Sequence, residues 1–177
     1  MASNPPATAR TRTAIPRSEG DVETRSWVPQ GVEAGVLGAS VVALFFLAFD
    51  LLAGRPLWTP FALGAALFRG EIPAAGSPLE PVLVLAYTAL HGTVFIGFGV
   101  PAAFWMLTRA RSAGGPLRGA LAALLLFVGF ELVFLSLGEL FVPGLTGMLG
   151  AGRVALATGL AAAAMAAFLA SRAARRE

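Results

Sequence analysis

The run VLGASVVALFFLAF, residues 36–49, carries no charged side chain and only one hydroxyl group. It forms the centre of a longer apolar segment, residues 32–53. The hydrocarbon core of a bilayer is ~30 Å thick, and a helix needs about 20 apolar residues to cross it. Three more segments meet that requirement, namely residues 81–107, 117–142 and 148–170. The sequence therefore predicts an all-α integral membrane protein, a bundle of four transmembrane helices.

The composition of the whole chain agrees with this fold class. Hydrophobic residues make up 56% of the 177 residues, and the mean hydropathy is +0.75, above what a soluble domain of this size can bury. We therefore expect the lipid bilayer as the main partner and no separate soluble domain. The absence of cysteine excludes disulfides, thiolate metal sites, iron–sulfur clusters and covalent c-type haem within this chain.

The basic residues predict the orientation, because arginine-rich connections stay on the cytoplasmic side. They gather before the first span, between the second and third spans, and after the fourth. All of them are arginine, and this composition, rich in alanine and glycine, is typical of GC-rich bacteria. We expect a bacterial inner-membrane protein with both termini in the cytoplasm, and we do not expect nucleic-acid binding. Residues 1–30 are predicted to form a disordered or partner-bound tail, residues 31–171 the transmembrane domain, and residues 172–177 a cytoplasmic C-terminus.

The first connection between spans, residues 54–80, contains a predicted short helix. The Thr59 hydroxyl is available to cap a helix, Pro60 suits a first helical position, and an apolar run follows to Phe68. This segment is too short to span the bilayer, so we expect it to lie in the outer interface or to re-enter the bundle. It would serve either as a lid on the bundle or as the lining of a substrate path.

Small residues indicate where helices approach each other closely, since helix association in lipid depends on backbone packing. The first span carries such residues at steps of four, the second carries two glycines, and the fourth carries another stripe. These residues are Gly31, Gly35, Ala39 and Ala43; Gly92 and Gly99; and Gly152, Ala155, Gly159 and Ala163. They predict a tight bundle.

Polar residues inside the spans are the first place to look for function, because a charge in hydrocarbon is costly. His91 and Glu131 each lie about 15 Å along their helices from the same end of the bundle, and Tyr87 lies one turn from His91. We predict that His91 and Glu131 are within hydrogen-bonding reach, directly or through one water. The pair would act as a structural clasp or as part of a proton or ion pathway. As a third alternative, His91 would ligate a haem or chlorin with a second ligand from another chain; the sequence itself predicts no cofactor.

A second polar layer is predicted nearer to the same end. Asp50 and Glu139 lie close to the ends of their spans, and Arg153 lies near the start of the fourth. The sequence predicts an ion-pair network in which Arg153 neutralises one of the two carboxylates.

The chain lacks the sequence patterns of zinc hydrolases, serine hydrolases and phosphate-binding loops, so an enzyme is not expected. The run from Asp50 to Gly64, with Ala86 to Gly92, resembles a group of four-span bacterial inner-membrane proteins. The resemblance implies the architecture and brings no activity, cofactor or partner. We expect an accessory or structural subunit of a larger membrane complex, bound to other membrane subunits or to itself. A small oligomeric transporter or channel that uses His91 and Glu131 is the alternative.

Overall fold

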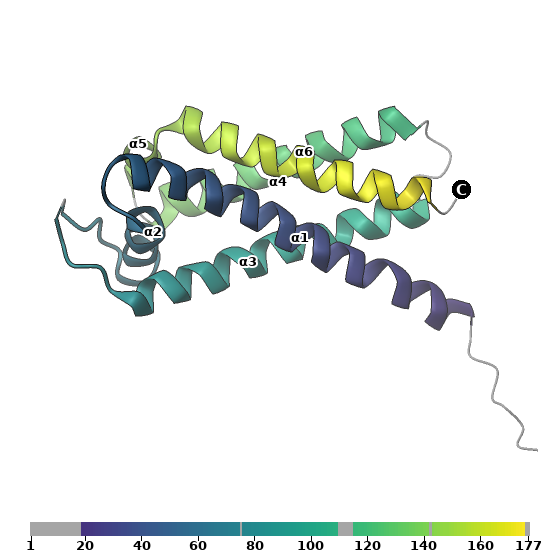
Figure 1. The fold of residues 1–177 in the computed structure, drawn as a ribbon, viewed down its shortest axis with the longest axis horizontal. Coiled ribbons are helices and arrows are strands. Elements are labelled where there is room, and N and C mark those ends of the chain that lie inside the picture. The colour runs from purple at the N-terminus through teal and green to yellow at the C-terminus, as the bar shows by residue number, and fades with distance from the viewer. Residues whose placement is uncertain (1–18, 75, 110–114, 142, 176–177) are drawn as a thin grey trace, which may run out of the picture.

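The computed structural model describes residues 19–74, 76–109, 115–141 and 143–175, and for residues 19–26, 115, 137–141, 145 and 146 it describes the backbone alone. All regular structure in these ranges is helical, which confirms the predicted class. The helices are α1 (Glu19–Leu52), α2 (Trp58–Arg69), α3 (Pro81–Phe104), α4 (Gly115–Phe141), α5 (Leu145–Leu149) and α6 (Ala151–Ala174) (Figure 1). A π-helical segment, Trp105–Arg109, continues α3.

Four of these helices are long and apolar enough to cross a membrane: Trp27–Leu52, Pro81–Arg109, Pro116–Ser136 and Ala151–Ala174. The protein is therefore a multi-pass membrane protein. Helix α1 begins at Glu19, inside the segment predicted as a tail, and it continues through Pro29. Extending an existing helix is far easier than nucleating one, so the polar composition of residues 19–30 does not prevent the first span from continuing into them.

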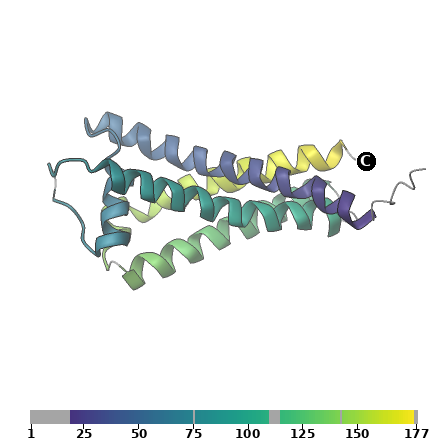
Figure 2. The ribbon, with the colours of Figure 1, turned by 90° about the horizontal axis from the view of Figure 1, so that it is seen from below.

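The four long helices of the bundle lie next to each other in the order α3, α1, α6, α4. Helix α1 packs against both α3 and α6, and α6 packs against α4, whereas α3 and α4 contact each other little. Figure 2 shows α3 and α4 separating toward one end of the bundle, where α2 lies across the long helices. We call this the α2 end, and we call the opposite end, where the polypeptide ends at the C-terminus, the terminal end.

Helices α1 and α3 approach each other through glycines. A Cβ atom added to Gly35 would lie 2.5 Å from the Ile96 Cα, and one added to Gly31 would lie 2.5 Å from the Val100 Cα. From the other side, a Cβ on Gly99 would meet the backbone of Gly31 and Gly35. The predicted close contact of the first two spans is confirmed at these three glycines.

The small-residue stripe predicted for α6 is wrong. Gly152 and Ala163 are exposed, and the buried face consists of Val154, Ala157, Thr158, Ala161, Ala162, Met165, Ala166, Leu169 and Ala173. The Met165 side chain packs against Gly38 of α1, in the space that a side chain at position 38 would occupy. Five of these nine buried residues are alanines, so small residues do mark the contact face of α6, but they lie on a different side of the helix from the predicted stripe.

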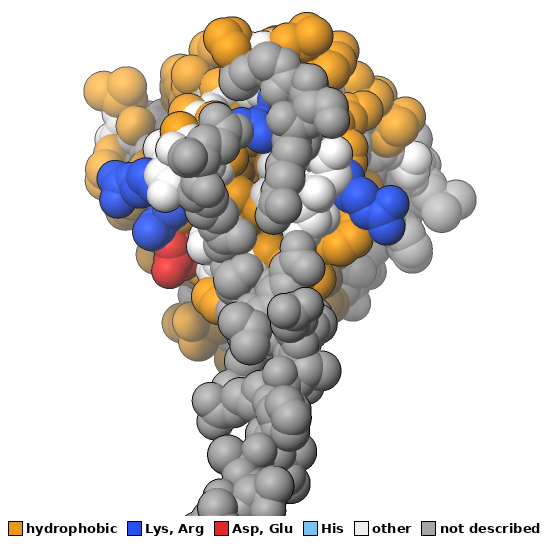
Figure 3. Space-filling view, turned by 90° about the vertical axis from the view of Figure 1, so that its right-hand side faces the viewer, with side chains coloured by type: hydrophobic (Ala, Val, Ile, Leu, Met, Phe, Trp, Pro, Cys, Tyr) orange, Lys and Arg blue, Asp and Glu red, His pale blue; other side chains and the backbone are white. Residues whose placement is uncertain are grey.

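Several arginines lie at the terminal end. Figure 3 views this end and shows arginine side chains between apolar ones. The Arg172 guanidinium on α6 donates to the Glu33 carboxylate on α1 at 2.9 Å. This pair connects the last turns of the chain to the first span.

Candidate binding cavity

A cavity of about 130 Å³ lies near the α2 end, between α3 and α4. Leu63 and Leu67 of α2 contribute to its lining, so the short helix is part of the cavity wall. The lining is mostly apolar, with three polar residues: Tyr87, His91 and Thr158. The other lining residues are Val42, Phe46, Leu90, Val94, Phe95, Phe130, Val133, Phe134, Leu149 and Val154. The predicted loop helix thus both covers the end of the bundle and lines an internal space.

One face of α3 supplies a column of rings to this cavity. Tyr87, His91 and Phe95 follow each other at four-residue spacing, which places their side chains on the same side of a helix. The Tyr87 and His91 rings are stacked with centroids 5.6 Å apart, and the His91 and Phe95 centroids are 4.7 Å apart. Phe95 in turn stacks on Phe130 of α4 at 4.4 Å. This ring contact joins α3 to α4 beside the cavity.

His91 is held by the neighbouring helix α1. Its Nε2 lies 3.2 Å from the carbonyl oxygen of Ala39. A carbonyl only accepts hydrogen bonds, so in this arrangement Nε2 carries the hydrogen and Nδ1 of the neutral ring is an acceptor. The small side chain of Ala39, part of the predicted stripe, lies at the place where α1 and α3 meet.

Glu131 has a different partner. Its Oε1 lies 2.6 Å from the hydroxyl oxygen of Thr158 on α6, and the same hydroxyl lies 2.9 Å from the Val154 carbonyl. The direct hydrogen bond predicted between His91 and Glu131 is therefore not formed. A matched position along two helices does not fix rotation about the helix axis, and the Glu131 side chain contacts α6.

The predicted ion pair between Asp50 and Arg153 is also absent. Asp50 is only 6% exposed, and its carboxylate accepts the Thr59 backbone N–H at Oδ2 and the Thr59 hydroxyl at Oδ1, both at 2.7 Å. Arg153 lies over the Phe49 ring, 5.1 Å from its centroid. The side chain of Glu139 lies outside the described residues.

Asp50 therefore caps α2. The helix begins at Trp58, one residue before Thr59, and its N-cap position is Leu57, which has a φ of 64° and offers no side-chain cap. Thr59 is at the second helical position, where a free N–H needs an acceptor. The prediction that the Thr59 hydroxyl is the cap is wrong, because that hydroxyl donates to Asp50. The sequence held a signal for this contact: a carboxylate at the end of one helix, eight residues before the start of the next helix at Trp58, whose N-cap residue offers no capping side chain.

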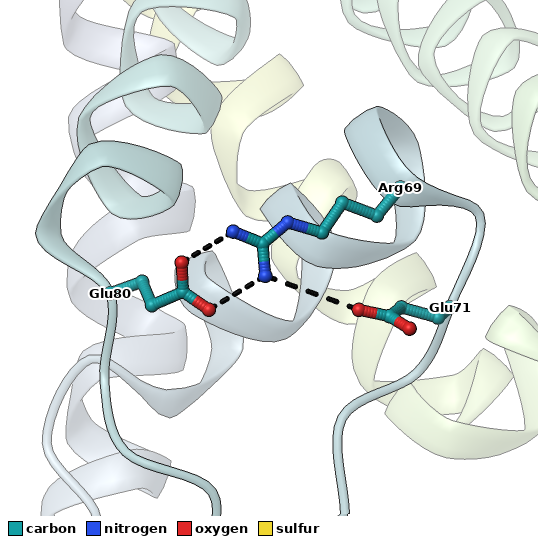
Figure 4. A network of polar contacts seen from close by, with 3 residues as sticks. All are labelled: Arg69, Glu71 and Glu80. Carbon is teal, nitrogen blue, oxygen red and sulfur yellow. Dashed lines mark hydrogen bonds and ion pairs between the residues drawn. The ribbon is translucent and has the colours of Figure 1, made fainter.

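Ion pairs tie the far end of α2 to the start of α3. Arg69 makes a two-pronged contact with the Glu80 carboxylate, with Nη1 to Oε1 at 2.6 Å, and its Nη1 also lies 4.0 Å from Glu71 (Figure 4). The hydrogen bond from Arg69 lowers the pKa of Glu80 below its ordinary value of 4.5. Asp50 and Glu80 thus hold the two ends of the short helix.

The lowered pKa of Glu80 predicts a pH dependence of its contribution to stability. A carboxyl with a lower pKa in the folded state stabilises the fold above its unfolded pKa, and the effect is lost as the pH falls through the folded value. The melting temperature of the wild type should exceed that of Glu80→Gln at neutral pH, by a small margin because the pair is exposed. The two melting temperatures should converge well below pH 4.5. A margin that persists there would mean that the charge of Glu80 is not the cause.

Within the described part of the chain, no three His, Asp or Glu side chains lie where they could hold a metal ion. Comparison of the chain with protein-family models, curated proteins and solved structures finds no match to any of them. The cavity and its lining residues are therefore the features of this protein that bear on its function.

Proposed function

We propose that this protein is a non-enzymatic membrane protein that takes up a lipid-soluble molecule from the bilayer into the cavity between α3 and α4. The observation that carries the proposal is the cavity itself, an apolar space with few polar groups, which is the usual composition of a small-molecule site. Leu90 lines the cavity and is 39% exposed, so we propose that the molecule enters from the bilayer beside this side chain of α3. We further propose a bacterial inner-membrane location with both termini cytoplasmic, based on the arginine distribution.

The transport and haem-binding alternatives have less support. His91 and Glu131 point to different partners, Ala39 and Thr158, so they do not combine into one site. A cavity of about 130 Å³ is close in size to one that holds a single benzene ring. A haem or chlorin macrocycle is several times larger than that.

A matched pair of valine substitutions on α4 tests the proposal. Val133 lines the cavity, whereas Val128 is 43% exposed on the outer surface of the same helix. Val133→Phe should fill the cavity and lower the amount of bound small molecule at least tenfold. Val128→Phe should leave that amount unchanged. The measurement is native mass spectrometry of the protein released from a mild detergent, followed by extraction of the bound compound. Equal retention in the wild type and both variants would contradict the proposal.

An accessory role in a larger membrane complex is the second candidate, and the outer surface of α4 favours it. Large apolar side chains follow one another along that surface, and α4 packs closely only against α6 among the long helices. The exposed residues are Leu117, Leu121, Leu124, Leu125, Val128, Leu132 and Leu135. The same mass spectra test this role. Partner subunits that stay bound after extraction from native membranes support it, and extraction of the protein without any partner contradicts it.

A further inference from the structure

We infer that the cavity recognises a hydroxylated aromatic ring on an apolar tail, the chemistry of an isoprenoid quinol or a related phenol. This inference rests on the proposed function and adds the chemical class of the ligand. Its basis is the joint placement of a ring-sized space, aromatic walls and two polar atoms whose hydrogen-bonding capacity is unused.

The size and walls of the cavity favour a ring. Its volume of about 130 Å³ is close to the ~150 Å³ of an apolar cavity that binds benzene. Phe46, Phe95, Phe130 and Phe134 line it together with Tyr87 and His91. Aromatic walls pack well against another ring in offset or edge-to-face arrangements. An acyl chain would fit the space but would gain nothing from this geometry.

Two polar groups favour an oxygen on that ring. Tyr87 lines the cavity, and its hydroxyl makes no hydrogen bond to another of the described residues. His91 uses Nε2 as a donor to Ala39, which leaves Nδ1 as an acceptor. A ligand hydroxyl can donate to Nδ1 of His91 and accept from Tyr87. An unsatisfied polar group in lipid is costly, so a ligand that pairs both groups has an advantage over a hydrocarbon.

The depth of these groups argues against a charged lipid headgroup. Tyr87 and His91 lie six and ten residues from Pro81 at the start of α3, about 9 and 15 Å along the helix axis. At that depth a charge is expensive, whereas a neutral phenol is tolerated. The exposed Leu90 marks the side on which an apolar tail would leave for the bilayer.

Single reporters in the chain make the test direct, because His91 is the only histidine and Tyr87 the only tyrosine. The full-length protein in nanodiscs, labelled with ¹⁵N-histidine, is titrated with phenol and with benzene, which lacks only the oxygen. Empty nanodiscs correct for partition into lipid. We expect phenol to bind about tenfold more tightly than benzene, as one or two hydrogen bonds imply, and to shift the Nδ1 resonance of His91.

Two matched variants complete the test. Tyr87→Phe removes the unused hydroxyl and should lower the affinity advantage of phenol over benzene severalfold. Thr88→Val removes a neighbouring hydroxyl that is exposed and bonded to the Val84 carbonyl, and it should have no effect. Equal binding of the two probes with no Nδ1 shift would overturn the ligand class and leave the proposed uptake of an apolar molecule intact. Failure of both probes to bind above lipid partition would also overturn the inference, and the Val133→Phe experiment then decides separately about the proposed function.

Discussion

Replacing Gly99 with alanine should unfold or separate the first two spans, whereas the same replacement at Gly97 should not. A Cβ at Gly99 would overlap the backbone of Gly31 and Gly35, which cannot move aside as a flexible side chain can. A Cβ at Gly97, two residues away on the same helix, would meet nothing within 4 Å. Overpacking of this kind typically costs 1–3 kcal/mol and sometimes more, and we expect about 3 kcal/mol or more at Gly99.

The comparison is informative because the two changes have the same intrinsic effect on the helix. Alanine favours a helix over glycine by up to ~1 kcal/mol, so Gly97→Ala should be neutral or slightly stabilising. Thermal unfolding in detergent, followed by circular dichroism, measures both variants. Similar melting temperatures for Gly97→Ala and Gly99→Ala would show that α1 and α3 do not approach as closely as their glycines indicate.

The number of the spans could be predicted because each is a long apolar run with few charges, whereas their ends could not, as the start of α1 at Glu19 shows. The rotation of each helix could not. A soluble helix reveals its buried face by a polar opposite face, but the faces of α3 and α4 are apolar on the lipid side as well. The sequence therefore predicted a direct contact between His91 and Glu131, whereas their hydrogen-bond partners in the structure are Ala39 and Thr158. The α1 glycines were an exception, since their four-residue spacing marks a contact face without any help from polarity.

The cavity was beyond sequence reasoning for a related reason. It exists because α3 and α4 contact each other little while α2 packs at that end of the bundle. No local sequence pattern predicts either of these packing arrangements. Two of its lining residues were nevertheless predicted to lie together, since His91 and Tyr87 were predicted as neighbours on one helix face. What the structure adds is the space in front of them and the role of Leu63 and Leu67 as its wall.

Asp50→Ala should release α2 and open that wall. The change removes the acceptor of both the Thr59 N–H and the Thr59 hydroxyl in a site where Asp50 and Thr59 are buried. Loss of a helix cap costs 0.5–2 kcal/mol, and an unsatisfied buried donor costs about 1–3 kcal/mol. We expect a total destabilisation of about 2–4 kcal/mol, with faster hydrogen exchange of the amides in Trp58–Arg69 and weaker retention of any cavity ligand.

Two further variants separate capping from the general effect of losing a charge in this region. Asp50→Asn keeps one acceptor oxygen, so its stability should fall between those of the wild type and Asp50→Ala. Glu71→Ala removes an exposed carboxylate whose contact with Arg69 is at 4.0 Å, and it should change little. The order wild type, Asp50→Asn, Asp50→Ala in both melting temperature and α2 protection is the signature of a cap. If Asp50→Ala instead behaves like Glu71→Ala, then α2 is held by its apolar contacts with α3, and the polar contact at its start contributes little to the wall of the cavity.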